Sequence, residues 1–228
     1  MTVRDSKALA EKVSTTVPRF EIKLGPSTAA SYVGDPRHLA FVSSRYKFVG
    51  KMLEGFERVL EVGCGDAFGA PFVAQAVGEL ICTDIDEPLL EDNRLRCAPF
   101  ANIAFEYFDF REKPLCPMVD GLYLIDVLEH IFPKEEEQFC INVFGSLKPH
   151  GVAVVGVPNI TGEAYASPMS KLGHVNLKDD RQFRETLKRY FHNVFLFSMN
   201  DEVIHTGYRP MSHYLFAICC EPRHHDRT

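Results

Sequence analysis

The fold of this chain is decided by residues 58–69, which read RVLEVGCGDAFG. A short apolar run typical of a β-strand ends at Gly63, Gly65 and Gly69, in the spacing G-x-G-x-x-x-G, and residues that suit a helix start follow. Because glycine has no Cβ, a ligand can approach the backbone of such a loop closely. In α/β proteins, loops of this kind bind nucleotide-like molecules at the carboxyl edge of a parallel sheet.

The remaining sequence alternates short apolar segments with segments of helical periodicity, which predicts a wound parallel sheet. Strands are expected at residues 58–62, 79–83, 103–107, 119–125, 152–157, 193–199 and 213–220. Helices are expected at about residues 71–76, 88–97, 135–147 and 180–190, with further helices before residue 55. About ten residues separate the third and fourth strands, which is too few for a full crossover helix. Residues 200–210 have no helical period and fit an antiparallel connection at an edge.

Composition and charge restrict the classes of function. The 228 residues carry a formal net charge of −6, which gives no general attraction for nucleic acid or anionic membranes. A basic cluster at residues 181–189 is interrupted by Asp179, Asp180 and Glu185 and is typical of a solvated helix face. Seven cysteines without a C-x-x-C pair favour reduced thiols. No apolar run is long enough for a membrane span and residues 1–20 lack a secretory signal's apolar centre, so we expect a cytoplasmic protein.

Four motifs together resemble one family. They are the glycine loop, the acidic strand end TDID at 83–86, the turn FDF at 108–110 and the turn LKPHG at 147–151. In this order they resemble the class I S-adenosylmethionine-dependent methyltransferases over about residues 37–220. Within that class, the segment IDVLEH at 125–130 resembles the branch of ubiquinone-pathway O-methyltransferases and small-RNA 2′-O-methyltransferases.

The resemblance implies a fold and a division of the chain. The expected fold is a Rossmann-like three-layer α/β sandwich, in which a seven-stranded, mostly parallel sheet with an antiparallel last strand carries helices on both faces. Residues 1–54 are expected to form an N-terminal helical segment that caps the cleft. Residues 55–228 would then form the S-adenosylmethionine-binding domain.

The resemblance also implies a set of cofactor contacts. Gly63 and Gly65 would face the methionine part of the cofactor, while Gly69 would let a helix and a strand pack. The full expected set is Glu61, Gly63, Cys64, Gly65, Asp84, Ile85, Asp109, Phe110 and Asp126.

Two of these carboxylates have alternative interpretations. Asp84 would accept hydrogen bonds from both ribose hydroxyls, with Asp86 as a competing candidate and a solvated turn as the structural alternative. By the resemblance, Asp109 would accept the adenine amino group while the Phe110 amide faces a ring nitrogen. A helix or turn cap is the alternative role for Asp109.

Ionisable side chains follow the fourth expected strand. In a helical turn, Asp126, Glu129 and His130 would project to one side, and such ligands suit Mg²⁺, Mn²⁺ or Zn²⁺. The resemblance implies that a later histidine, here His174, joins them around an ion that polarises a substrate hydroxyl. Glu129 and His130 are the predicted catalytic residues. Two alternatives stay open, namely His130 as an unaided general base, and a structural role for Asp126 and His130.

The predicted reaction transfers the sulfonium methyl group of S-adenosylmethionine to an oxygen of a small-molecule or sugar acceptor. An NAD-dependent dehydrogenase is a rival, although its fingerprint places the third glycine one residue earlier. A non-catalytic S-adenosylmethionine-binding partner protein is a second rival. A nucleic-acid methyltransferase is a third, against which the negative charge weighs. Nucleic acid is therefore not the expected partner, and the sequence indicates no oligomeric state.

Overall fold

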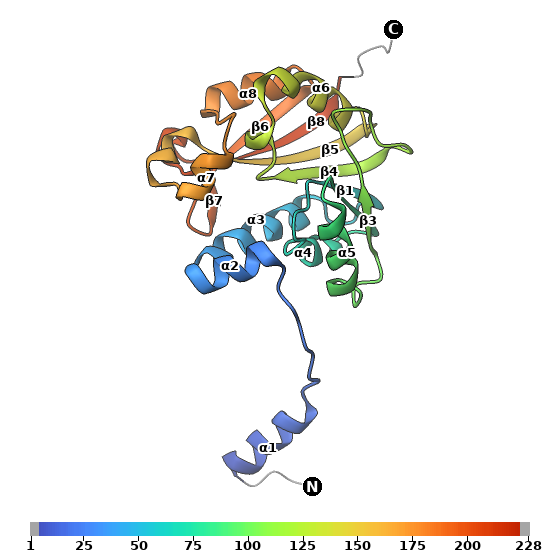
Figure 1. Cartoon of the computed structure of the whole chain (residues 1–228), viewed down its shortest axis with the longest axis vertical. Helices are drawn as coiled ribbons and strands as arrows, with labels where there is room; N and C mark the ends of the chain where they lie inside the picture. The colour runs from blue at the N-terminus through green and yellow to red at the C-terminus, as the bar shows by residue number, and fades with distance from the viewer. Residues whose placement is uncertain (1–4, 224–228) are drawn as a thin grey trace.

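An eight-stranded sheet in the order β3-β2-β1-β4-β5-β8-β6-β7 runs through the molecule, with helices on both sides (Figure 1). The computed structural model describes residues 5–223. The parallel strands are β1 Arg58–Val62, β2 Glu79–Asp84, β3 Ile103–Tyr107, β4 Val119–Ile125 and β5 Leu147–Pro158. β8, Tyr214–Pro222, is antiparallel to both β5 and β6, Phe191–Asn200. The predicted fold class is confirmed, including the reversed last strand.

The sheet has one strand more than the seven that the sequence predicts. β7, Val203–His205, pairs antiparallel with β6 at the outer edge, from Ser198↔His205 to Asn200↔Val203. Asp201, with φ of 48°, lies in the tight turn between the two strands. Three residues are too few to show the alternation that identifies a strand, so the sequence indicated only a connecting loop.

Helices cover both faces of the sheet. On one face lie α3 His38–Met52, α4 Ala70–Ala74 and α5 Glu87–Arg96, and on the other lie α6 Pro133–Phe144 and α8 Asp180–Lys188. The four helices predicted after residue 55 are present, with ends that differ by up to three residues. The shorter elements are α7 Pro168–Gly173 and the 3-10 turns η1 Leu128–His130, η2 Ile160–Tyr165 and η3 Arg209–Met211. Residues 108–118, between β3 and β4, contain no helix, as their length predicts.

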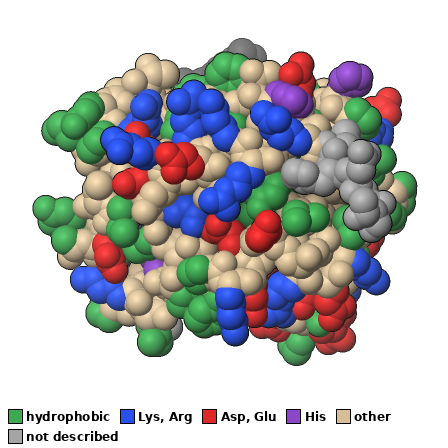
Figure 2. Space-filling view, turned by 90° about the horizontal axis from the view of Figure 1, so that it is seen from above, with side chains coloured by type: hydrophobic (Ala, Val, Ile, Leu, Met, Phe, Trp, Pro, Cys, Tyr) green, Lys and Arg blue, Asp and Glu red, His purple; other side chains and the backbone are tan. Residues whose placement is uncertain are grey.

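The sheet separates two apolar clusters, which explains why its strands read as continuous apolar runs. In β1, Val59 faces the cluster beneath α3 and α4, while Leu60 faces the cluster beneath α6, and both side chains are fully buried. Helix α8 buries Phe183 and Leu187 and leaves its charged residues in solvent. The face seen from above in Figure 2 mixes basic and acidic side chains. The predicted solvated helix face at residues 181–189 is therefore confirmed.

The N-terminal segment divides into two parts. Helix α2, Pro26–Gly34, and α3 lie against the domain, whereas α1, Ser6–Thr16, stands away from it and buries none of its residues (Figure 1). That residues 1–54 cap the cleft stays a prediction. No helix in the described part of the chain combines the length and apolar character needed to cross a membrane.

Candidate active site

The glycine loop follows β1 and turns at two glycines with positive φ. Gly63 has φ of +70° and Gly65 of +52°, a region that favours glycine. A Cβ on Gly63 would lie 2.7 Å from Cγ2 of Val127, whereas a Cβ on Gly65 would meet nothing within 4 Å. Gly65 is therefore the glycine whose bare backbone is open to an approaching ligand.

Gly69 makes a contact that differs from the expected one. A Cβ at this position would lie 2.1 Å from the ring of Tyr46 in α3. Tyr46 packs in turn against Tyr123 of β4, with ring centroids 6.1 Å apart. Gly69 thus makes room for an aromatic side chain of α3, so the packing that it permits involves a helix from the N-terminal segment.

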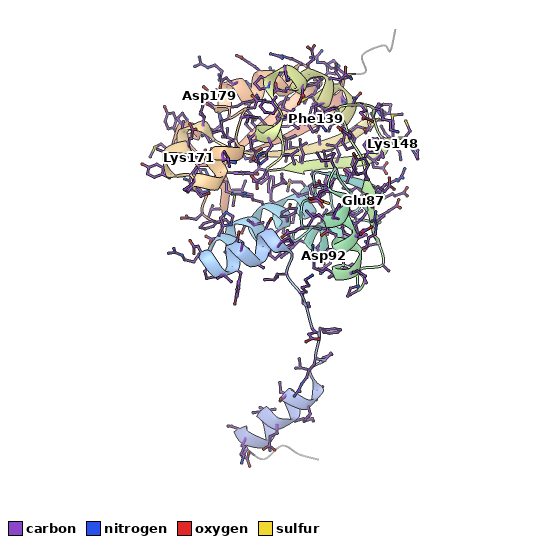
Figure 3. The ribbon with its side chains drawn as sticks, in the orientation of Figure 1. Glu87, Asp92, Phe139, Lys148, Lys171 and Asp179 are labelled. Carbon is purple, nitrogen blue, oxygen red and sulfur yellow. The ribbon has the colours of Figure 1, made fainter. Side chains whose placement is uncertain are left out.

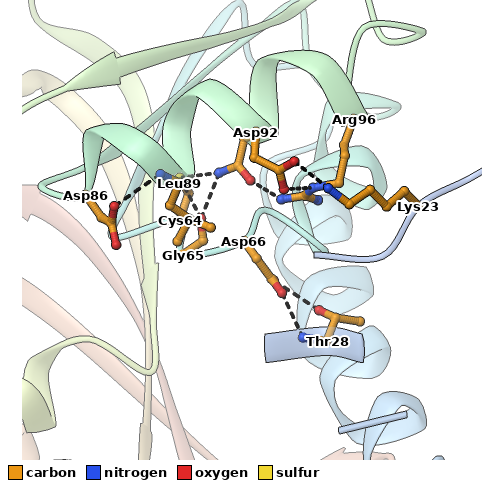
Figure 4. A network of polar contacts seen from close by, with 10 residues as sticks. Lys23, Thr28, Cys64, Gly65, Asp66, Asp86, Leu89, Asp92 and Arg96 are labelled. Atoms are coloured by element: carbon orange, nitrogen blue, oxygen red, sulfur yellow. Dashed lines mark hydrogen bonds and ion pairs between the residues drawn. The ribbon is translucent and has the colours of Figure 1, made fainter. Parts of the chain in front are cut away.

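Two polar contacts hold the loop from outside (Figure 4). The Asp66 carboxylate accepts hydrogen bonds from the Thr28 amide at 2.7 Å and from the Thr28 hydroxyl at 3.0 Å. Asn93 of α5 donates to the Gly65 carbonyl at 2.8 Å. No local sequence pattern marks these three residues, because each partner lies 28 or 38 positions away along the chain.

The acidic end of β2 is tied to the glycine loop. Oδ2 of Asp84 accepts a hydrogen bond from the Gly65 amide at 2.9 Å, and Oδ1 accepts from the amides of Ile85 at 2.7 Å and Asp86 at 3.1 Å. Asp86 instead caps α5 by accepting from the Leu89 amide at 3.1 Å (Figure 4). Of the two competing carboxylates, Asp84 is the one in contact with the glycine loop.

Glu61 and Cys64 are buried on the inner side of the loop. Oε2 of Glu61 accepts a hydrogen bond from the Cys82 thiol, with the atoms 3.2 Å apart. Burial raises the pKa of Glu61 to about 7, and the hydrogen bond from the Cys82 thiol opposes that rise. The two side chains therefore support the loop from beneath, and a direct cofactor contact stays a prediction for both.

The turn after β3 is organised by an ion pair that the sequence did not reveal. Oδ2 of Asp109 lies 2.6 Å from Nη2 of Arg111, and Oδ1 accepts from the Arg111 amide at 2.8 Å. This partner holds the pKa of Asp109 below its ordinary value. Phe110 is buried, and its carbonyl accepts from Asn142 at 2.8 Å. The structure thus shows Asp109 in the turn-capping role, and its contact with adenine stays a prediction.

The turn after β4 is held by a buried arginine. Asp126 adopts a positive φ of 57°, and its Oδ2 lies 2.5 Å from Nη1 of Arg45 in α3. The Arg45 guanidinium also stacks 3.8 Å above the ring of Tyr214. These contacts anchor α3 over the carboxyl ends of β4 and β5 and direct the Asp126 carboxylate toward Arg45.

Three of the four predicted metal ligands come together. One potential ligand atom from each of Glu129, His130 and His174 lies within 4.8 Å of the others, while Asp126 is outside this group. Glu129 is 1% exposed, and neither of its carboxylate oxygens has a hydrogen-bond partner among the described residues. Burial, with a smaller contribution from Asp126, raises the pKa of Glu129 well above its ordinary value. A buried, unpartnered carboxylate beside two imidazoles is a donor set that fits a divalent cation.

The two histidines of this cluster have defined orientations. Nδ1 of His130 lies 2.8 Å from the Gly173 carbonyl, which can only accept, so Nδ1 carries the hydrogen and Nε2 keeps its lone pair. The His174 ring lies 5.2 Å from the His130 ring, centroid to centroid. Burial and the neighbouring His130 lower the pKa of His174, which favours the neutral imidazole that a metal requires.

Two surface cavities of the described chain lie apart from this cluster. A cavity of about 570 Å³ is lined by Asp180, Arg181 and residues 206–210. Another, of about 530 Å³, is lined by residues 55–57, Asp120 and residues 148–151. Neither is lined by the glycine loop or by Glu129, so the candidate site is defined by converging polar groups.

Comparison with known proteins shows what the central part of the chain resembles. Residues 59–151 match a family model described as a methyltransferase domain. Over this range the chain is similar to methyltransferase domains. It is 32% identical over 102 residues to a probable S-adenosylmethionine-dependent methyltransferase of Mycolicibacterium smegmatis, covering 44% of this chain and 38% of the relative. A ubiquinone biosynthesis O-methyltransferase of Rickettsia felis is 28% identical over 130 residues, covering 54% of this chain and 48% of the relative.

The chain also has structural neighbours at low sequence identity. The methyltransferase domain of bacterial CtHen1 aligns with a TM-score of 0.67 at 14% identity, over 79% of this chain and 98% of the other. The N-methyltransferase NodS of Bradyrhizobium japonicum, in complex with S-adenosyl-L-homocysteine, aligns with a TM-score of 0.59 at 15% identity, over 82% and 87%. These neighbours confirm the fold. The curated relatives match over less than half of their own length.

Proposed function

We propose that this protein transfers the methyl group of S-adenosylmethionine to a hydroxyl oxygen of a small-molecule or sugar acceptor. The methyltransferase domain at residues 59–151 and the names of the relatives support the cofactor and the reaction class. The observation that carries the choice of oxygen is the cluster of Glu129, His130 and His174, with its buried, unpartnered carboxylate. An amine acceptor already has a free lone pair, whereas a hydroxyl needs help to lose its proton.

In this proposal the cofactor lies along the carboxyl ends of β1, β2 and β3. The open backbone at Gly65 would face the methionine part, and Asp84 would bind the ribose. A carboxylate offers about four lone-pair positions, and Asp84 already accepts three amide bonds. Binding both ribose hydroxyls therefore requires the release of at least one amide. Asp109 and the Phe110 amide would bind the adenine edge, and α2 and α3 would cover the cleft.

Glu129, Nε2 of His130 and His174 would hold a divalent ion beside the acceptor. Two imidazoles and one carboxylate favour Zn²⁺ or Mn²⁺ over Mg²⁺, which prefers oxygen ligands. Such an ion lowers the pKa of a bound hydroxyl and eases its deprotonation. Without an ion, His130 would act as the general base through the lone pair on Nε2. Asp126, paired with Arg45, would position the turn rather than bind the ion.

Calorimetric titration with S-adenosylhomocysteine, together with methyl-transfer assays with and without a metal chelator, tests the proposal. We expect the protein to bind S-adenosylhomocysteine with measurable heat and to transfer labelled methyl groups to members of a panel of phenols and sugars. Chelation should abolish that transfer, and Zn²⁺ or Mn²⁺ should restore it. His130→Ala should lose metal binding and methyl transfer but keep its affinity for the cofactor. His150→Ala should behave as the wild type, because His150 lines the cavity of about 530 Å³, which lies apart from the cluster.

The outcomes separate the parts of the proposal. Absence of S-adenosylhomocysteine binding to the wild type would exclude the methyltransferase function. Methyl transfer that is undiminished in chelator would exclude a role for a metal ion and leave His130 as an unaided general base. Transfer to amines alone would contradict the choice of oxygen.

A further inference from the structure

Residues 160–177 form a segment that carries His174 but contributes nothing to the core. None of its described side chains is buried, and Tyr165 and Leu172 are 92% and 79% exposed. The residues that flank the segment, Asn159 and Lys178, are buried at 2% and 9% exposure. Because apolar packing does not fix this segment, the position of His174 depends on the polar contacts that its carboxyl-terminal end makes.

Those contacts centre on a partly enclosed ion pair. Nζ of Lys178 lies 2.5 Å from Oε2 of Glu136 in α6, and the two side chains are only 10% and 13% exposed. Asn176 joins the pair: its Nδ2 donates to Oε2 of Glu136 at 2.5 Å, and its Oδ1 accepts from Lys178 at 2.7 Å. We call Glu136, Asn176 and Lys178 the anchor triad.

Backbone contacts link the anchor triad to the metal-ligand cluster. The amides of Val175 and Asn176 donate to the Glu129 carbonyl at 2.9 and 3.0 Å. The Gly173 carbonyl accepts from Nδ1 of His130. Residues 173–176 therefore lie directly along η1, with His174 between the two points of contact.

The backbone of Lys178 also joins the segment to the sheet. The Lys178 carbonyl accepts from the Ile160 amide at 3.1 Å, and Lys178 forms an isolated parallel bridge with Asn159 at the end of β5. The segment therefore leaves β5 and returns to it at one buried point. Without the triad side chains, backbone contacts alone would hold the carboxyl-terminal end of the segment and, with it, His174.

A buried ion pair is a poor source of stability, because an apolar pair of similar volume often stabilises a fold equally well. What such a pair supplies is a defined geometry. We propose that Glu136, Asn176 and Lys178 are positioning residues that hold His174 where it can share a divalent ion with Glu129 and His130. This proposal rests on the metal site of the proposed function.

The test compares metal binding with fold stability in matched variants. Lys178→Met leaves Glu136 without its cation, whereas the double variant Glu136→Leu with Lys178→Met removes both charges. Lys148→Met is the control, because Lys148 forms an ion pair of similar length with Asp120, at 2.7 Å, but lies across the molecule from Lys171 of α7 (Figure 3). Zn²⁺ and Co²⁺ affinity, the Co²⁺ absorption spectrum, the melting temperature without metal and S-adenosylhomocysteine affinity are measured for each protein.

We expect Lys178→Met to bind metal about 10- to 100-fold more weakly and to shift the Co²⁺ spectrum. The double variant should recover the melting temperature of the wild type but not its metal affinity, since stability and geometry have different causes. S-adenosylhomocysteine affinity should stay unchanged throughout, because the glycine loop contacts α2 and α5 rather than the triad. Hydrogen exchange at residues 160–173 should slow when metal is added to the wild type, and less so in Lys178→Met.

Failure of the two proposals can be distinguished. A wild type that binds S-adenosylhomocysteine but no metal would overturn the metal site and the positioning role with it, leaving the methyltransferase reaction intact. A wild type that binds metal, with Lys178→Met binding equally well, would overturn the positioning role alone. Recovery of metal affinity together with melting temperature in the double variant would show that the triad is only structural.

Discussion

Gly65 and Gly69 lie four positions apart in one loop, but a methyl group would have different effects at each. At Gly65 the backbone conformation is left-handed and the space beside it is open. At Gly69 the backbone is right-handed, and the space is filled by the ring of Tyr46. Gly65 therefore leaves room for a ligand, and Gly69 leaves room for the Tyr46 side chain of α3.

These differences predict that two alanine substitutions both lower stability but that only one of them weakens cofactor binding. Gly69→Ala should lower the free energy of unfolding by about 1–3 kcal/mol through overpacking, with little direct effect on the open side of the loop. Gly65→Ala should cost about 1–2 kcal/mol of backbone strain and should also weaken S-adenosylhomocysteine binding, since its methyl group occupies the open side. Urea unfolding and calorimetric titration measure both quantities. Wild-type affinity in Gly65→Ala would contradict the assignment of the open backbone to the cofactor.

At the scale of elements, β1 places a carboxylate inside the domain. Glu61 lies under the glycine loop against Cys82 of β2, and burial raises its pKa from an ordinary value of 4.5 to about 7. Between these two values the folded state binds more protons than the unfolded state. The free energy of unfolding must therefore fall as the pH rises through this range.

We predict that this carboxylate lowers the stability of the cofactor-free protein by about 3 kcal/mol between pH 4.5 and pH 7.5. Glu61→Gln should remove that part of the pH dependence and should be the more stable protein at pH 7.5, because an amide does not ionise. Glu79→Gln, at an exposed position on β2, serves as the control. Chemical unfolding at several pH values gives the comparison, and parallel pH profiles for wild type and Glu61→Gln would refute the prediction.

Elements with a strong local pattern could be predicted from the sequence, and those defined by distant partners could not. The expected strands at 58–62, 103–107 and 119–125 have the bounds of β1, β3 and β4. For β1 and β4 the reason is that buried parallel strands read as apolar runs. The edge strand β7 and helix α7 were missed because three and six residues show no period. In the site, Glu129, His130 and His174 converge as predicted. Asp126 was expected among them, but its partner Arg45 lies 81 positions earlier in the chain.

At the scale of the whole molecule, the N-terminal segment contributes through α2 and α3. Thr28 of α2 holds Asp66 in the glycine loop, and Arg45 of α3 holds Asp126 after β4. Helix α1 stands away from the rest of the described chain (Figure 1) and has no buried residue. Its Leu9 and Val13 are each 52% exposed. Among the described residues, contact with the rest of the fold therefore begins after α1, where Lys23 forms an ion pair with Asp92 of α5 at 2.8 Å.

Deletion of residues 1–17 should consequently change the melting temperature by no more than about 2 °C, because none of the residues described in that range, 5–17, is buried. S-adenosylhomocysteine affinity should also be retained. By contrast, Thr28→Val should lower the free energy of unfolding by about 1–3 kcal/mol, since it leaves the Asp66 carboxylate without one of its two donors. Thr28→Val should also lower the affinity for S-adenosylhomocysteine, because the glycine loop loses that support. Differential scanning fluorimetry and calorimetric titration of both variants provide the measurements. If the deletion lowered the affinity for S-adenosylhomocysteine without changing the melting temperature, α1 itself would have to contact the site when the cofactor is bound.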